Sequence, residues 1–135
     1  MKTILKISEA AVIALHAVDL MSREPGKVHS AACIAGELGV PYNHLSKILQ
    51  RLTKAGFAVP LRGPRGGFSL AGKTGSSTLR DVIEAIEGPL TFSDCLMGGR
   101  VCGRKNCSFN RLLAETNSRF EKMLAQKIAD FSKHR

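Results

Sequence analysis

Three cysteines, Cys95, Cys102 and Cys107, lie within thirteen residues of a segment rich in glycine and basic side chains. Glycines between them allow a short loop to fold back, so that several sulfur atoms can face one point. Thiolates placed in this way are ligands for zinc or for an iron–sulfur cluster. The alternatives are a disulfide with one spare thiol, or three unrelated buried cysteines. Three thiolates leave one coordination position open, and its occupant would decide whether the site is structural or labile.

The other cysteine and the four histidines do not form a second constellation. Cys33 lies in the apolar segment 31–34, which predicts a free cysteine in the core. The histidines are scattered along the chain. The sequence shows neither a pairing of nucleophile and base nor a phosphate-binding glycine motif, so we expect no enzymatic activity.

The N-terminal apolar stretch carries Glu9, His16 and Asp19 and lacks a small-residue cleavage site, which is unlike a secretory signal peptide. No apolar run is long enough to span a membrane. These observations predict a cytoplasmic protein without membrane contact. In that compartment thiols stay reduced, and a cysteine cluster holds a metal rather than a disulfide.

The 135 residues predict one domain, and the net charge of +9 is unevenly distributed along it. No acidic residue lies between Glu37 and Asp81, whereas the same interval contains seven lysines and arginines. A field of one sign suits a polyanion such as nucleic acid. A solvated basic face without a partner is the alternative interpretation.

Capping residues indicate three helices in the first part of the chain. Ser8 predicts the N-cap of a helix that runs to about residue 23, and Ser30 that of a helix over 31–38. Gly39 supplies the left-handed residue after the second helix. Pro41 is expected at the first position of a third helix that ends near residue 55. A helix, a tight turn and a helix form the helix-turn-helix arrangement.

The third helix is amphipathic. Leu45, Ile48, Leu49 and Leu52 recur at three- and four-residue spacing, so we expect them to face the core. The opposite face carries side chains of the kinds that contact bases and phosphates, namely Asn43, His44, Ser46, Lys47, Gln50 and Arg51. Any solvent-exposed face carries such residues, so this pattern alone is weak evidence for DNA binding.

A basic hairpin is expected directly after this helix. Two short apolar runs, 57–62 and 68–70, flank a turn rich in glycine and proline, which predicts a β-hairpin. The turn carries Arg62 and Arg65 and no acidic residue. A helix-turn-helix followed by a basic hairpin predicts a winged helix, whose wing arginines can reach a phosphate backbone or enter a minor groove.

Two further helices are expected. Thr78 and Asp81 resemble a capping box that opens a helix through Glu87. From about residue 108 to the C-terminus, apolar residues from Leu112 to Phe131 form one helical stripe. A helix that projects from a small domain buries such a stripe on a second subunit, which predicts a homodimer. Packing on its own domain, or a mixture of both arrangements, stays open.

With these elements in place, the chain resembles the IscR/NsrR-type bacterial regulators. These are dimeric winged-helix transcription repressors, and members often carry an iron–sulfur cluster. The resemblance covers nearly the whole chain and is carried by residues 6–11, 34–41, 45–57, 62–68 and 81–89 and by the three cysteines.

The resemblance implies that Cys95, Cys102 and Cys107 bind a [2Fe-2S] or [4Fe-4S] cluster. It implies that the start of the third helix contacts DNA through Asn43, His44, Ser46 and Lys47. It also implies that the wing contacts DNA through Arg62 and Arg65. Members of the IscR type have a glutamate where this chain has Ser46, so their operator sequence cannot be transferred.

The fourth cluster ligand is where the chain departs from one branch of this family. Members of the IscR type have a histidine three residues after the last cysteine, and here that residue is Asn110, a poor iron ligand. Members of the NsrR type use a carboxylate near the N-terminus of the partner subunit, and Glu9 falls at that position. An acid in the first turn of a helix is also favoured by the helix dipole, so both interpretations of Glu9 stay open.

The predicted fold is mostly α-helical: a winged helix-turn-helix with a small β-hairpin wing and a long C-terminal dimerisation helix. We expect a DNA-binding domain over residues 1–88, a cluster-binding cysteine loop over 89–108 and the dimerisation helix over 109–135.

The predicted function is that of a DNA-binding transcriptional regulator, acting as a repressor. An iron–sulfur cluster that senses redox state, nitric oxide or iron–sulfur status would control its affinity for a double-stranded DNA operator. The alternative is a regulator of the same family without a cluster, in which the cysteines form a thiol switch or a zinc site, for example one linked to cysteine metabolism. An electron-transfer or metal enzyme is disfavoured by the helix-turn-helix and the acid-free basic stretch.

Overall fold

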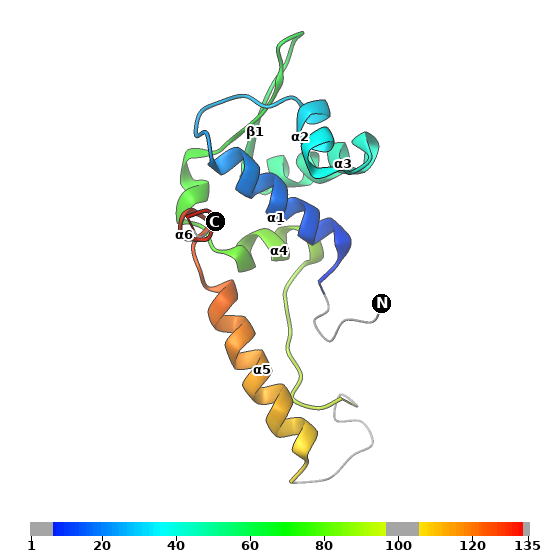
Figure 1. The fold of residues 1–135 in the computed structure, drawn as a ribbon, viewed down its shortest axis with the longest axis vertical. Helices are drawn as coiled ribbons and strands as arrows, with labels where there is room; N and C mark the ends of the chain where they lie inside the picture. The colour runs from blue at the N-terminus through cyan, green and yellow to red at the C-terminus, as the bar shows by residue number, and fades with distance from the viewer. Residues whose placement is uncertain (1–6, 97–105, 134–135) are drawn as a thin grey trace.

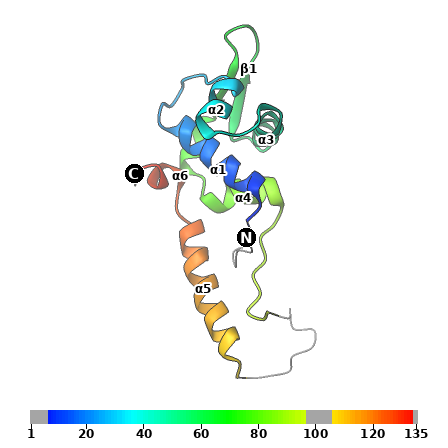
Figure 2. The same ribbon diagram turned by 45° about the vertical axis from the view of Figure 1, so that its right-hand side comes forward.

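The computed structural model describes residues 7–96 and 106–133. Its elements in chain order are α1 (Glu9–Ser22), α2 (Ala31–Leu38), α3 (Tyr42–Lys54), β1 (Ala58–Leu61), β2 (Gly67–Leu70), the 3₁₀ turn η1 (Gly72–Ser76), α4 (Leu79–Glu87), α5 (Ser108–Leu124) and α6 (Ile128–Phe131). Elements α1 to α4, with the hairpin, form the winged unit, and α5 extends away from it in both views (Figures 1 and 2). The predicted winged helix-turn-helix with a hairpin and a long C-terminal helix is confirmed.

Capping hydrogen bonds fix the starts of the helices. The Ser8 hydroxyl accepts a hydrogen bond from the N–H of Ala11 at 3.1 Å, and both bonds of the capping box between Thr78 and Asp81 are present. Gly39 has a left-handed φ of 66°, as expected for the residue that ends α2. Pro41 differs from expectation: it is the N-cap of α3 rather than its first residue, because its ψ of 135° is still extended.

Helix α1 lies at the centre of the winged unit and packs against α2, α3, α4, β2 and α6. The predicted core face of α3 is confirmed, since Leu45, Ile48, Leu49 and Leu52 are all buried. The polar face of α3 is thereby turned outward. Helix α3 itself lies beside α2 and next to the wing (Figure 1).

The wing is an antiparallel pair in which Ala58 faces Leu70 and Leu61 faces Gly67. The loop before α2 pairs with it, because the backbone N–H and C=O of His29 bond to Phe68 at 2.8 and 2.7 Å. A Cβ at Gly67 would lie 2.1 Å from the carbonyl oxygen of His29, so this approach requires glycine. The wing is therefore fixed to the helix-turn-helix at its base.

The expectation of one C-terminal helix is wrong beyond residue 124. Helix α5 ends at Leu124, and residues 126–128 pair with residues 77–79 at the start of α4, with the Leu79 N–H donating to the Gln126 carbonyl at 3.1 Å. The short α6 follows and packs against α1 and η1. Leu124 and Ile128 are 2% and 1% exposed, so the distal part of the predicted stripe belongs to the core of its own chain.

Cys33 is exposed, which contradicts its predicted place in the core. The short helix α2 buries only Ile34 and Ala35, so the residue just before this pair is left exposed to solvent. Separately, none of the described helices is long and apolar enough to cross a membrane.

Candidate nucleic-acid interface and cysteine loop

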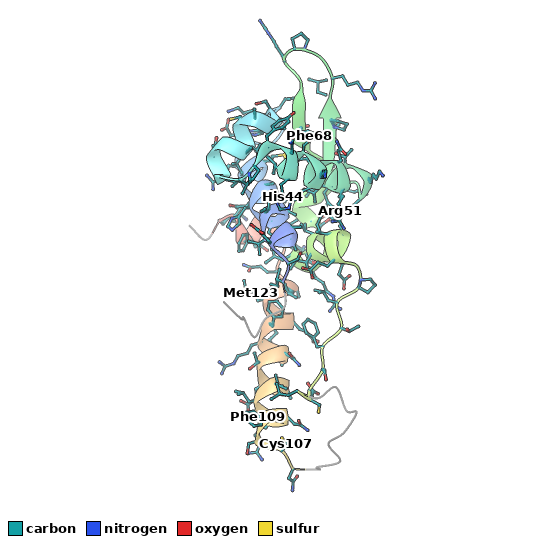
Figure 3. All side chains as sticks on the ribbon, turned by 90° about the vertical axis from the view of Figure 1, so that its right-hand side faces the viewer. His44, Arg51, Phe68, Cys107, Phe109 and Met123 are labelled. Carbon is teal, nitrogen blue, oxygen red and sulfur yellow. The ribbon has the colours of Figure 1, made fainter. Side chains whose placement is uncertain are left out.

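The exposed face of α3 holds most of the residues predicted to contact DNA. Asn43, Lys47 and Gln50 are exposed, and His44 and Ser46 are half-buried. Figure 3 labels His44 near the start of this helix. These side chains lie on the first three turns of α3, where they form a polar surface.

Sequence reasoning missed Tyr42, the first residue of α3, whose side chain is 54% exposed. Tyr42 lines a cavity of about 380 Å³ that is bounded by Ser30 at the start of α2 and by Arg62 on the wing. Its place directly after Pro41, where helix α3 opens, was the available signal. The cavity joins the three elements that a winged helix presents to DNA.

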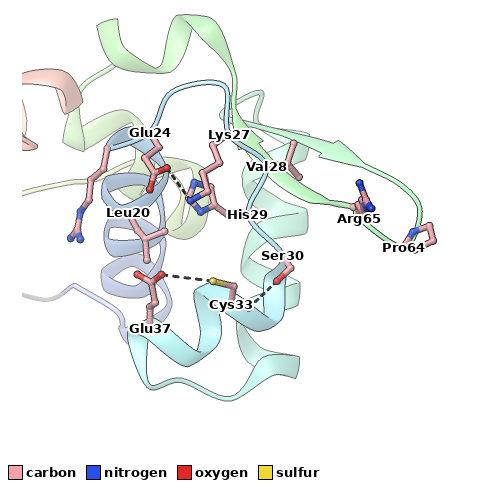
Figure 4. A pocket seen from close by; sticks show the side chains of 12 residues that line it. Leu20, Glu24, Lys27, Val28, His29, Ser30, Cys33, Glu37, Pro64 and Arg65 are labelled. Atoms are coloured by element: carbon pink, nitrogen blue, oxygen red, sulfur yellow. Dashed lines mark hydrogen bonds and ion pairs between the residues drawn. The ribbon is translucent and has the colours of Figure 1, made fainter.

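The wing arginines, Arg62 and Arg65, are both exposed. The turn between them is closed by a hydrogen bond from the N–H of Gly66 to the carbonyl of Gly63 at 2.9 Å. Arg65 and the neighbouring Pro64 stand near the tip of the hairpin (Figure 4). Both side chains are therefore accessible to solvent on the wing.

Arg51 behaves differently from the other residues of the predicted DNA-contacting set. Its Nη2 atom donates a hydrogen bond to the backbone carbonyl oxygen of Ile86 near the end of α4. The guanidinium therefore joins α3 to α4, and we assign Arg51 to this internal contact.

Cys95 and Cys107 are half-buried free thiols at the two ends of the segment that contains Cys102, which lies outside the described residues. Cys107 and Asn110 line a cavity of about 690 Å³ together with Asp94 and Glu115. Among the described residues, no three histidine, cysteine, aspartate or glutamate side chains converge on one point. The donor chemistry nevertheless suits a cluster, because two reduced cysteine thiols flank the position of the third.

Glu9 is exposed at the start of α1. Cys107 lies at the far end of α5 (Figure 3), about 25 Å along the helix from its junction with the winged unit, at 1.5 Å per residue. The structure therefore does not bring Glu9 and Cys107 of one chain together.

A network of polar contacts fixes the segment between α4 and the cysteines. The Arg80 Nε atom contacts Glu84 Oε1 at 2.9 Å, and the same carboxylate oxygen accepts a hydrogen bond from the N–H of Leu90 at 3.0 Å. The Leu90 N–H and then Arg80 hold the pKa of Glu84 below its usual value. Ionised Glu84 thus holds α4 and the following segment together.

The same segment touches α5. The rings of Phe92 and Phe120 meet edge to face with centroids 5.8 Å apart, and the guanidinium of Arg80 lies 5.9 Å from the Phe92 ring. Nearer the cysteines, Asn117 Nδ2 donates to the Ser93 carbonyl at 3.0 Å. A continuous set of contacts therefore runs from the residues next to Cys95 to α4.

The Rrf2 family, described as iron-dependent transcriptional regulators, matches residues 7–134. The chain belongs to the Rrf2 family. The resemblance to the IscR/NsrR-type regulators drawn from its motifs is thereby confirmed.

Similar sequences occur in bacteria. A candidate HTH-type transcriptional regulator of Rhodopseudomonas palustris, BadM, is 32% identical over 62% of this chain and 53% of its own length. Protein aau3 of Rhizobium meliloti is 34% identical over 76% of this chain and 68% of its own length. The chain thus spans about half of the first relative and two thirds of the second.

Solved structures share the fold. CymR of Bacillus subtilis, the global cysteine regulator, superimposes with a TM-score of 0.80 at 21% identity, over 98% of this chain and 99% of CymR. IscR of T. potens superimposes with a TM-score of 0.70 at 24% identity, over 96% and 87% of the two chains. Both likenesses confirm the winged-helix architecture.

Proposed function

We propose that this Rrf2-family regulator is a homodimeric repressor whose affinity for an operator is controlled by an iron–sulfur cluster on Cys95, Cys102 and Cys107. The observation that carries the DNA-binding part is the common outward side formed by the start of α3, the start of α2 and the wing, which enclose one cavity between Tyr42 and Arg62. A groove-reading helix flanked by a basic hairpin is the arrangement that places base contacts beside phosphate contacts.

The positions of the exposed cations support the same surface as the DNA-binding surface. Of the seven cations in the acid-free stretch, Arg51 and Arg80 have hydrogen-bond partners inside the protein. Lys47, Arg62 and Arg65 are exposed on α3 and the wing. These three side chains would neutralise phosphates, while Asn43 and Gln50 are suited to base edges.

The second subunit is proposed from α5. Its exposed apolar residues Phe109, Leu112 and Met123 are 52–59% exposed, and their spacing puts them on one helical face. Two copies that bury this face would set the distance between two recognition helices, as a two-fold operator requires. Residues beyond Leu124 are not part of this proposed seam.

Cys95, Cys102 and Cys107 would hold the cluster, and Glu9 of the partner subunit is the proposed fourth ligand. The wide separation of Glu9 from Cys107 within one chain is in accord with a ligand supplied by the other subunit. When bound, a cluster supplies a centre that reacts with oxidants and nitric oxide. Residues of this chain would transmit a change in the cysteine loop to the helices. Asn117 and Phe92 connect the segment before Cys95 to α5, and Arg80 and Glu84 connect the same segment to α4.

A second candidate function keeps the DNA surface but has no cluster. Its support is Asn110, which lines the cavity beside Cys107 and is a weak ligand for iron. In that case the cysteines would act as a thiol switch or bind zinc. Visible absorbance of anaerobically purified protein separates the two candidates, since only an iron–sulfur protein is coloured.

The DNA-binding part is tested by titrating duplex DNA at several salt concentrations. The logarithm of the binding constant should fall with the logarithm of salt by about 0.9 for each phosphate contacted. Arg62→Gln and Arg65→Gln should each reduce that slope by about one unit, whereas Lys133→Gln, far from the wing, should leave it unchanged. A slope that neither wing substitution alters would show that the wing does not touch the backbone.

A further inference from the structure

Tyr42 is the single tyrosine of the chain and the first residue of α3, where it is 54% exposed. Its hydroxyl makes no hydrogen bond to any residue that the structure describes. The DNA-binding proposal gives Tyr42 no role of its own. The hydroxyl is a donor that the fold does not use, so it is available to a partner.

Tyr42 and Arg62 line the same cavity of about 380 Å³, between α3, the wing and the start of α2. Within the described part of the chain, the guanidinium of Arg62 forms no ion pair. No acidic residue is among those that line this cavity, whereas Asp94 and Glu115 line the cavity beside Cys107. The cavity between α3 and the wing therefore carries a positive charge that no lining carboxylate offsets, which suits an anion.

Part of the lining of this cavity is apolar. Pro60 and Leu61 of β1 and Phe68 of β2 contribute to it, and Leu61 is 54% exposed. A DNA backbone presents an apolar sugar next to a charged phosphate, and proteins contact both groups. An apolar wall beside a neutral donor and a cation therefore matches a sugar–phosphate unit better than it matches a small free anion.

Tyr42 lies beside the residues proposed to read bases rather than among them. Asn43, Lys47 and Gln50 follow one another at four- and three-residue spacing on the exposed face of α3. Tyr42 precedes this line by one residue, which is about 100° around the helix. It also shares its cavity with Arg62 on the wing. When the line of polar residues faces a groove, Tyr42 and Arg62 are therefore placed at the backbone that borders the groove.

We propose that Tyr42 is a positioning residue for DNA, and that the cavity holds one sugar–phosphate unit of the backbone. The Tyr42 hydroxyl donates a hydrogen bond to a phosphate oxygen, Arg62 neutralises the same phosphate, and the sugar lies against the apolar wall. This contact fixes the register of α3 in the groove and does not depend on base sequence. The inference rests on the proposed DNA-binding function, and it is independent of the proposed cluster.

Titration of two short duplexes of equal length, one rich in A·T pairs and the other in G·C pairs, tests the contact in the full-length protein. Tyr42→Phe should weaken binding of both duplexes about tenfold, as expected for one hydrogen bond to a charged group. The salt slope should stay the same, because a neutral donor releases no counterion. The melting temperature of the free protein should also stay the same, since the hydroxyl has no described partner there.

Two results of this titration would overturn the proposal. Unchanged binding of both duplexes would show that the hydroxyl does not contact DNA. A loss confined to one duplex would assign Tyr42 to base reading rather than to the backbone.

A cycle of double substitutions tests whether Tyr42 and Arg62 hold the same phosphate. In the Arg62→Gln background, Tyr42→Phe should weaken binding only about twofold, because the phosphate is no longer held in the cavity. Arg65 is the matched control, since it is exposed on the same wing but does not line this cavity. In the Arg65→Gln background, Tyr42→Phe should again cost about tenfold. Equal losses in the two backgrounds would contradict a shared phosphate.

Ala32 allows the charge of the occupant to be tested. It is an exposed residue in the first turn of α2 and lines the cavity. The helix dipole favours an acid at this place, so Ala32→Glu should fold, yet its carboxylate would repel a phosphate. We expect Ala32→Glu to bind both duplexes about tenfold more weakly than Ala32→Gln, the uncharged control of the same size. Equal binding by these two variants would overturn the proposal.

A direct signal from the cavity is available because the chain has one tyrosine. Protein that carries 3-fluorotyrosine should give one fluorine resonance, which reports on position 42 alone. This resonance should move as either duplex is added and stop moving when the protein is saturated. A resonance that stays in place while the duplex binds would contradict the proposal.

This proposal and the proposed DNA-binding function fail in different ways. If the protein binds neither duplex at low salt, the DNA-binding function is wrong and the role of Tyr42 falls with it. If the protein binds both duplexes with the expected salt slope while Tyr42→Phe binds like wild type, the DNA-binding function stands and the role of Tyr42 is wrong.

Discussion

The guanidinium of Arg51 donates a hydrogen bond to the backbone carbonyl oxygen of Ile86. This contact joins α3, the helix proposed to read DNA, to α4, the last helix before the cysteine loop. Helix α4 is in turn tied to the loop through Arg80, Glu84 and Leu90. A change in the order of the loop therefore has a structural route to the recognition helix.

Replacing Arg51 should weaken this route without removing a phosphate contact. For Arg51→Met we expect the free energy of unfolding to fall by about 1 kcal/mol, the typical net value of one hydrogen bond. DNA affinity should fall while the salt slope stays constant. Lys47→Met is the matched comparison on the same helix: it should reduce the slope by about one unit and leave thermal stability nearly unchanged. Equal loss of slope in both variants would assign Arg51 to the phosphate backbone instead.

The exposed face of α5 predicts the effect of a charge on assembly. Leu112→Asp should weaken the dimer by about 100-fold or more, because an unpaired carboxylate would be buried in the seam. Ser118→Asp lies on the opposite face of the same helix and should leave the dimer intact. Analytical ultracentrifugation of the two variants decides the point, and a wild-type monomer at micromolar concentration would refute the dimer proposal.

Leu124 cannot serve in that test, although its place in the apolar stripe suggested the seam. It is buried within its own chain, so Leu124→Asp should unfold the winged unit rather than separate subunits. The sequence shows helical periodicity up to Phe131, but it does not show the break after Leu124. That break depends on backbone pairing with residues 77–79, which are distant in sequence.

The lowered pKa of Glu84 predicts a pH dependence of the segment before the cysteines. A carboxylate with a lowered native pKa contributes its full stability above its usual value of 4.5 and loses it as the pH falls through the lower native value. Glu84→Gln should therefore lower the melting temperature at neutral pH, and the difference from wild type should vanish in acid. Glu115→Gln, on the exposed surface of α5, is the control. A difference that persists in acid, once the Glu84 carboxylate is protonated in both states, would show that its charge is not involved.

Local chemistry made the winged unit predictable. Ser8, Ser30 and Thr78 start helices through side-chain bonds to nearby N–H groups, and Gly39 ends one through its left-handed conformation. The polar face of α3 was predictable from its helical periodicity. The basic wing was predictable from the turn rich in glycine and proline. Cys33 was misplaced because α2 is short and its apolar composition does not reveal which residues reach the core. The contact of Arg51 with Ile86 depends on elements distant in sequence, which no local pattern encodes.

The cluster ligands are tested by single substitutions in anaerobically purified protein. Cys95→Ala, Cys102→Ala and Cys107→Ala should each abolish visible absorbance, because two thiolates are too few to hold the cluster. Glu9→Ala should load poorly or lose its colour faster in air, whereas Cys33→Ala and Asn110→Ala should match wild type. Bleaching by Asn110→Ala without an effect of Glu9→Ala would show that the fourth ligand has been assigned wrongly.

The central claim is that the state of the cysteine loop controls DNA affinity. The most direct measurement is the binding constant of one operator duplex for anaerobically purified, coloured protein before and after chelation of its iron, at constant salt. We predict a loss of at least about tenfold in affinity after chelation, with the dimer preserved, and recovery when the cluster is rebuilt. Equal binding by the coloured and the stripped protein, or a protein that contains no iron and sulfide when purified without air, would contradict the account.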